Sequence, residues 1–157
     1  MRAFGQKMTR KYPPADFGDL GQRHEVHVFL YRFGDWGLQY LLLQAEPRQE
    51  RVWRPVVGAI DWDEDVRHAA LRQVFKDVGV GHAFDLISPP WGLISELGDL
   101  QLVQWPVGFQ IPHHDALLRP QRAIAAVNWC GFEQAMHLLD ASLFRQNLLQ
   151  LHLRLSA

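Results

Sequence analysis

Residues 58–80, GAIDWDEDVRHAALRQVFKDVGV, constrain the fold more than any other stretch of the chain. Asp65 suits the N-cap of a helix, because its carboxylate can accept a hydrogen bond from an amide of the first turn. Gly79 suits the left-handed position that ends a helix. Between them, apolar residues recur every four positions: Val66, Ala70, Val74 and Val78. The pattern predicts a helix over 66–78 that buries one face and follows an acidic loop.

Extended segments are predicted before this helix. Residues 24–33 alternate between apolar and polar side chains, and residues 38–46 form a second apolar run after the turn 34–37. This is the pattern of a β-hairpin. Residues 52–60 predict a third strand, in which Pro55 indicates a sheet edge or a bulge, because proline has no amide hydrogen to donate.

The second half of the chain predicts further strands and a helical end. Strands are expected at 82–94 and 100–111, a loop at 111–122 and a last strand at 123–129. Two helices are expected after them, at 131–139 and 141–155. Strands on both sides of a central helix predict an α/β fold, with a mixed sheet flanked by helices. We expect an N-terminal segment at 1–22 and a single domain at 23–157.

Composition argues against several classes of function. The net charge of −1 argues against a nucleic-acid partner, because phosphate binding needs clustered Lys and Arg. No stretch of about 18 apolar residues is present, so no membrane partner is expected, and no apolar run of a signal peptide follows the basic start. The single cysteine, Cys130, allows no intrachain disulfide and predicts a buried thiol in a cytoplasmic protein.

Positions 73, 76 and 77 of the predicted helix have the spacing of a metal-binding face. Hydrolysis of a diphosphate needs a cation that neutralises the phosphate oxygens, and Mg²⁺ prefers carboxylate ligands. Side chains at i, i+3 and i+4 share one face of a helix. The residues found there are Gln73, Lys76 and Asp77, which together carry no net formal charge.

Residues 58–80 resemble the box of the MutT-like Nudix hydrolase family, whose pattern is G-x5-E-x7-R-E-U-x-E-E-x-G-U, with U a bulky aliphatic residue. Six positions match: Gly58, Glu64, Arg72, Val74, Gly79 and Val80. The likeness extends over roughly residues 24–140, because a hairpin precedes the box and NWCGFEQAMHLL resembles the family's Trp-then-helix ending. It implies a Nudix-like α/β/α sandwich.

The resemblance also implies a degenerate box. The metal-binding glutamates of the family correspond to Gln73, Lys76 and Asp77, so we expect no resident metal, with Asp77 the best remaining ligand. The pair that matches Glu64 and Arg72 helps to hold the loop against the helix in the family.

Gly58 and Gly79 are expected to be structural. Gly58 would let the chain bend back over the helix, and Gly79 would end the helix. Ala69 and Ala70 are small enough to let the helix lie close to the sheet.

Other polar residues are weaker candidates. Loop acids could replace the lost glutamates, although solvated charges or caps are the simpler interpretation: Asp61, Asp63, Asp65, Glu96, Asp99 and Asp115. His113, His114 and Asp115 do not predict zinc, because adjacent histidines point in different directions and no second cluster has ligand spacing.

Three functions remain open. The first is a Nudix-fold protein that binds a nucleotide-like or other phosphorylated small molecule, with metal-dependent pyrophosphate hydrolysis lost or strongly weakened. Its ligand would meet Lys76, Gln73, Arg54 and Arg72. The resemblance also leaves a homodimer open.

The alternative is an active pyrophosphohydrolase that cleaves nucleoside diphosphate-linked substrates. It would use Mg²⁺ or Mn²⁺ with Asp77 and Glu64 as catalytic residues, and non-standard metal ligands. The third function is an interaction module whose exposed tryptophans bind another protein.

Overall fold

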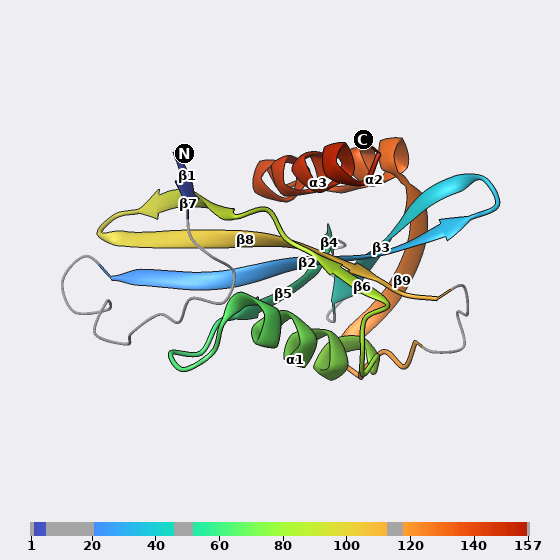
Figure 1. Cartoon of the computed structure of the whole chain (residues 1–157), viewed down its shortest axis with the longest axis horizontal. Helices are drawn as coiled ribbons and strands as arrows, with labels where there is room; N and C mark the ends of the chain where they lie inside the picture. Colours follow the sequence, from blue (N-terminus) through green and yellow to red (C-terminus); the bar gives the residue numbers. More distant parts are fainter. Residues whose placement is uncertain (1, 6–20, 46–51, 113–117, 157) are drawn as a thin grey trace.

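The chain forms a mixed β-sheet with helices on both faces (Figure 1). The structure is a computed structural model, and it describes residues 2–5, 21–45, 52–112 and 118–156. Within these residues the sheet has nine strands. The arrangement is the α/β/α sandwich predicted from the sequence.

The helices form the two outer layers. Helix α1 (Val66–Val78) lies on one face of the sheet, whereas α2 (Phe132–Leu138) and α3 (Ser142–Leu155) lie on the other (Figure 1). Among the residues that the structure describes, no helix is long and apolar enough to cross a membrane.

Helix α1 begins and ends where the sequence predicts. The amide of His68 donates a hydrogen bond of 2.8 Å to Asp65 Oδ1, which caps the first turn. Gly79 has a φ of 76°, and its amide donates to the carbonyl of Phe75 at 3.0 Å. A residue without a Cβ adopts this left-handed conformation without strain, so the helix stops there.

Strand β2 (Gln22–Gly34) is the long central strand of the sheet. It pairs in parallel with β8 (Leu100–Gln110) along one edge. Along its other edge it pairs antiparallel with β5 (Val56–Ala59) and then, after its midpoint, with β3 (Gly37–Ala45). The predicted hairpin of the second and third strands is thereby confirmed.

The remaining strands extend the sheet outward. Strands β4 (Trp53–Arg54) and β9 (Ile124–Gly131) pair with β3, and β6 (Asp85–Ile87) and β7 (Trp91–Leu97) pair with β8. Strand β1 (Arg2–Gly5) pairs with β7 at the edge of the sheet. The N-terminal segment therefore contributes a strand to the domain.

Proline interrupts two predicted strands. The extended piece 52–60 is divided at Pro55 into β4 and β5, as the proline indicated. The single strand predicted over 82–94 is wrong: β6 and β7 are separate strands on either side of residues 88–90. The two prolines in this break, Pro89 and Pro90, have no amide hydrogen for a strand ladder.

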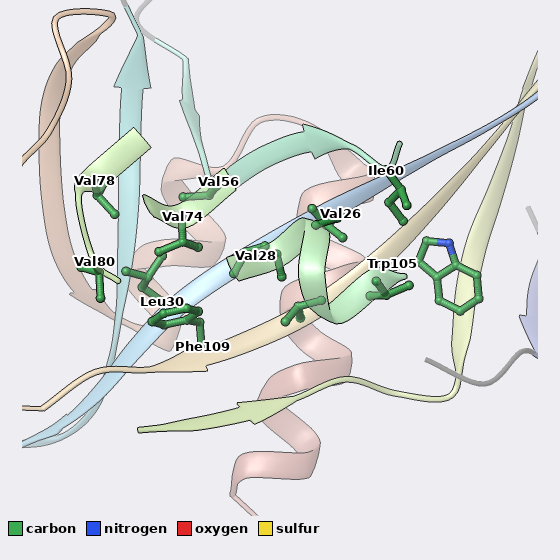
Figure 2. Packing of buried hydrophobic residues seen from close by; sticks show 14 of the residues in the cluster. Val26, Val28, Leu30, Val56, Ile60, Val74, Val78, Val80, Trp105 and Phe109 are labelled. Atoms are coloured by element: carbon green, nitrogen blue, oxygen red, sulfur yellow. The ribbon is translucent and has the colours of Figure 1, made fainter. Parts of the chain in front are cut away.

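Two apolar cores lie on opposite faces of β2. Val26, Val28 and Leu30 point toward α1, and Figure 2 shows them packed with Val74 and Val78 of that helix. The alternate residues, such as Phe29 and Tyr31, join the core under α2 and α3: Phe29, Tyr31, Tyr40, Leu42, Cys130, Ala135, Leu139, Leu148 and Leu151. The alternation of β2 thus fixes which helix covers each face.

Candidate functional site

Glu64 and Arg72 form a two-pronged ion pair. Arg72 Nε donates to Glu64 Oε2 at 2.7 Å, and Arg72 Nη2 donates to Glu64 Oε1 at 2.9 Å. Arg72 Nη2 also donates to the carbonyl of Ala59 at 2.7 Å, and the amide of Asp61 donates to Glu64 Oε1 at 2.9 Å. The predicted pair is confirmed, and it ties the end of β5 and the following loop to α1.

This pairing shifts the protonation of both partners. Burial alone would raise the pKa of Glu64, but the hydrogen bonds from Arg72 and Asp61 and the nearby positive charge lower it below its usual value. The hydrogen bond to Glu64 raises the pKa of Arg72. Both groups are therefore charged across a wide pH range, and the pair persists.

The structural role of Gly58 differs from the expected one. The prediction that Gly58 bends the chain is wrong, because it lies inside β5 and does not have a positive φ. Its α-carbon instead lies against the side chain of Gln73. A Cβ at this position would overlap Gln73 Oε1 and lie 2.6 Å from Cγ and Cδ. Glycine is needed here for close approach of strand and helix.

Gln73 and Asp77 meet on the buried side of α1. Gln73 Nε2 donates to Asp77 Oδ1 at 3.1 Å, and Gln73 Oε1 accepts a long bond of 3.4 Å from Arg72 Nη1. Arg54 Nη1 lies 4.0 Å from Asp77 Oδ2 and donates to the carbonyl of Pro55 at 2.8 Å. The cation nearest to this carboxylate is therefore a guanidinium from β4.

Burial dominates the electrostatics of the Arg54–Asp77 pair. It raises the pKa of the Asp77 carboxyl, an effect that the Arg54 charge, the Gln73 hydrogen bond and the Lys76 charge only partly oppose. Burial likewise lowers the pKa of Arg54, and the Asp77 charge partly offsets this. The two groups sit in a partly dry environment, where charge interactions are stronger than in water.

Lys76 is more exposed than Gln73 and Asp77. Its side chain is exposed on α1, whereas Gln73 is buried and Asp77 is 13% exposed. The three positions with the spacing of a metal-binding face thus hold a buried amide, a mostly buried carboxylate and an exposed ammonium.

This donor set does not fit a divalent cation. Mg²⁺ and Mn²⁺ take oxygen ligands, mainly carboxylates and water. Here one carboxylate is available, and it already faces Arg54 and the amide of Gln73. Throughout the described residues, no group of three or more His, Cys, Asp or Glu side chains could hold a metal ion.

The other candidate acids are scattered. Asp61 Oδ2 lies 4.0 Å from Arg72 Nε, and Asp65 caps α1. Asp63 is exposed in the same loop, whereas Glu96 belongs to β7 and Asp99 to the turn before β8. His113, His114 and Asp115 lie outside the described residues.

The backbone after residue 117 completes the C-terminal end of α1. The amide of Arg119 donates to the carbonyl of Val78 at 2.6 Å, and the amide of Gln121 donates to that of Asp77 at 3.0 Å. The sequence predicts a loop over 111–122, which includes this stretch. Every residue except proline has a backbone amide, so the residue types of this stretch do not reveal these hydrogen bonds. Gly79 marks the end of the helix, where the last backbone carbonyls have no partner within the helix and need donors from elsewhere.

Cys130 takes no part in this site. The thiol is buried in the core under α2, and burial raises its pKa to about 11. A thiol in this state is a poor nucleophile, so the prediction of a buried, packing cysteine is confirmed.

Solved structures share this fold. The Nudix domain of NrtR from Shewanella oneidensis, in complex with ADP ribose, has a TM-score of 0.68 at 20% identity, over 92% of this chain and 94% of that chain. An Ap4A hydrolase from C. elegans, as a binary complex, has a TM-score of 0.66 at 20% identity, over 85% and 98%. The E. coli dihydroneopterin triphosphate pyrophosphohydrolase gives 0.61 at 17% identity, over 90% and 97%.

The likeness establishes the architecture. The chain has the Nudix fold, an α/β/α sandwich with a mixed sheet. No protein-family model matches the sequence, and no curated protein matches it.

Proposed function

We propose that this protein binds a nucleotide-like or other phosphorylated small molecule, and that metal-dependent pyrophosphate hydrolysis is lost or strongly weakened. The surroundings of Asp77 carry the proposal. This carboxylate is the only acid at positions 73, 76 and 77, and its two oxygens already face Gln73 and Arg54. A divalent cation there would have to displace these groups and would be repelled by the guanidinium.

Arg54 and Lys76 supply the positive charge for the ligand. Arg54 is 24% exposed, so its guanidinium can reach an anion while it remains partly shielded from water. A guanidinium binds phosphate oxygens through two parallel hydrogen bonds, and an ammonium binds them as a point charge. Arg72 is engaged with Glu64 and Ala59, which favours a structural role for it. A Nudix domain solved with ADP ribose supports a ligand of this class.

Calorimetric titration with ADP ribose in the presence of a chelator tests the proposal. We expect saturable binding without metal, and Arg54→Gln should weaken it at least about tenfold, since hydrogen bonds to charged groups contribute about 1.5–3 kcal/mol. Arg67→Gln is the control, because Arg67 is exposed on α1 and belongs to neither ion pair. No saturable binding by the wild type, or unchanged affinity in Arg54→Gln, would contradict the proposal.

An active pyrophosphohydrolase is the second candidate. Two structural neighbours are named as an Ap4A hydrolase and a pyrophosphohydrolase, which favours this activity. Asp77 and Glu64 would then be the catalytic residues, with Mg²⁺ or Mn²⁺ supplying positive charge at the phosphates. A metal-dependent turnover assay separates the two candidates.

A further inference from the structure

Two polar contacts between α3 and the sheet involve a histidine. In the first half of the helix, Asn147 Nδ2 and His27 Nδ1 of β2 are 2.8 Å apart, and both residues are buried. Near the end of the helix, the Tyr40 hydroxyl of β3 and His152 Nδ1 are 2.7 Å apart. Because histidine is the side chain that commonly gains a proton in mildly acidic solution, acid can act on the α3 layer at these two contacts.

The contact at His27 has partners for both protonation states. His27 Nε2 lies 2.8 Å from Glu25 Oε1, and this carboxylate can accept a hydrogen from the neutral or the protonated ring. His27 Nδ1 faces the Asn147 amide, whose Oδ1 has no hydrogen-bond partner among the described residues. A half-turn of the amide would present this oxygen to a protonated Nδ1. Protonation of His27 therefore need not break the contact.

The contact at His152 fits the neutral ring. Tyr40 is fully buried, and burial raises the pKa of its hydroxyl, so the hydroxyl keeps its hydrogen and donates it to Nδ1. A protonated His152 would carry a hydrogen on Nδ1 as well, and this hydrogen would point at the same hydroxyl. The hydroxyl hydrogen would then lose the acceptor that it has in the described part of the chain. A buried donor without an acceptor is costly.

The other surroundings of His152 also favour the neutral ring. Phe132 of α2 stacks on it, with ring centres 3.9 Å apart and planes 11° from parallel. An aromatic face attracts a positive charge, but burial outweighs this attraction and lowers the pKa of His152 below its usual value. The charged or titratable side chains of the two helices around it are exposed to solvent: Glu133 and His137 of α2, and Arg154 of α3.

The chain ends its last helix one turn beyond this contact. Helix α3 stops at Leu155, and the amide and hydroxyl of Ser156 donate to the carbonyl of His152 at 2.9 and 2.6 Å. Leu151 and Leu155 pack in the same core as Tyr40. A few apolar contacts and one hydrogen bond to the sheet thus hold the last turn, so the loss of that bond should loosen this turn first.

We propose that the hydrogen bond between Tyr40 and His152 makes the docking of the last turn of α3 sensitive to pH: the turn is docked when the ring is neutral and loosens when acid protonates it. The inference is independent of the ligand proposed above. The contribution of this contact is fully present above the ordinary histidine value of 6.5, and it is lost as the pH falls from there toward the lower value of the docked ring.

NMR measurements on the full chain test the proposal. Hydrogen-exchange protection factors of residues 152–156 should fall by up to about tenfold per pH unit below 6.5, the most that one proton can contribute. Tyr40→Phe should raise the pKa of His152, because the hydroxyl that favours the neutral ring is gone. Tyr31→Phe is the matched control, since Tyr31 is a buried tyrosine of the same core and is not the partner of His152.

A second variant removes the titration and keeps an acceptor. His152→Asn offers a neutral oxygen to the Tyr40 hydroxyl, so its protection factors should not change with pH. Wild-type protection factors that stay constant from about pH 7 to about pH 5 would overturn the proposal. An equal pKa of His152 in the wild type and in Tyr40→Phe would overturn it as well. If Tyr40→Phe does not fold, the comparison with His152→Asn decides: the same pH dependence in this variant and the wild type would assign the effect to another group.

Discussion

Glu64 organises the polar side of α1 through its ion pair with Arg72. Its carboxylate is 15% exposed and receives three hydrogen bonds, two from Arg72 and one from the amide of Asp61. Arg72 extends the connection to the carbonyl of Ala59. Removal of the carboxylate would leave donors of both the loop and the helix without their acceptor.

Glu64→Gln should lower the free energy of unfolding by about 1–3 kcal/mol, a value between those for exposed and buried ion pairs. Chemical denaturation measures this change. Asp63→Asn is the matched control, because Asp63 is exposed in the same loop. Equal unfolding free energies for the wild type and both variants would show that the pair does not hold the loop.

The lowered pKa of Glu64 gives the sign of the pH dependence. The folded protein keeps this carboxylate ionised to a lower pH than the unfolded chain does. Its stabilising contribution is therefore present above the ordinary value of 4.5 and is lost as the pH falls through the folded value. Stability of the wild type should fall more steeply over this range than that of Glu64→Gln. Parallel stability curves would contradict this assignment.

At the scale of elements, α1 is positioned by small residues that let it approach the sheet. Ala69 and Ala70 are fully buried, and Gly58 of β5 lies directly against the Gln73 side chain. The same close contact positions the Gln73 amide for its bond to Asp77. The position of α1 on the sheet and the hydrogen bond between Gln73 and Asp77 thus depend on one close contact between β5 and α1.

Gly58→Ala should destabilise the protein by about 1–3 kcal/mol, because the added methyl group overlaps Gln73. The cost should shrink in a Gln73→Ala background, where the space is free, and a double-mutant cycle measures this coupling. Gly131→Ala is the control, because a Cβ there meets nothing within 4 Å. Strict additivity of Gly58→Ala and Gln73→Ala would mean that the contact does not limit the fold.

At the scale of the whole molecule, the sequence predicted what depends on local chemistry. Helix α1 was predicted to the residue because Asp65 and Gly79 act within one turn of its ends. The ion pair of Glu64 and Arg72 followed from the resemblance to the Nudix pattern. The break between β6 and β7 was missed because the apolar run continues on both sides of Pro89 and Pro90.

Contacts between distant segments could not be predicted in the same way. Arg54 meets Asp77 only because β4 pairs with β3 and α1 ends nearby. Arg32 meets Trp129 because their strands lie on opposite edges of β3. Alternation along residues 124–131 already puts Val127 and Trp129 on one face, but it does not say what else lies on that face.

We propose that this Nudix-fold protein binds a phosphorylated ligand and has lost metal-dependent hydrolysis, or retains it only weakly. The most direct test follows the cleavage of ADP ribose by the purified protein with and without added Mn²⁺. We predict little or no turnover with Mn²⁺, far below ordinary enzyme rates, because Asp77 is the only acid at positions 73, 76 and 77 and faces Arg54. Metal-dependent turnover at ordinary enzyme rates of about 1–10³ s⁻¹, abolished by Asp77→Ala, would contradict the claim.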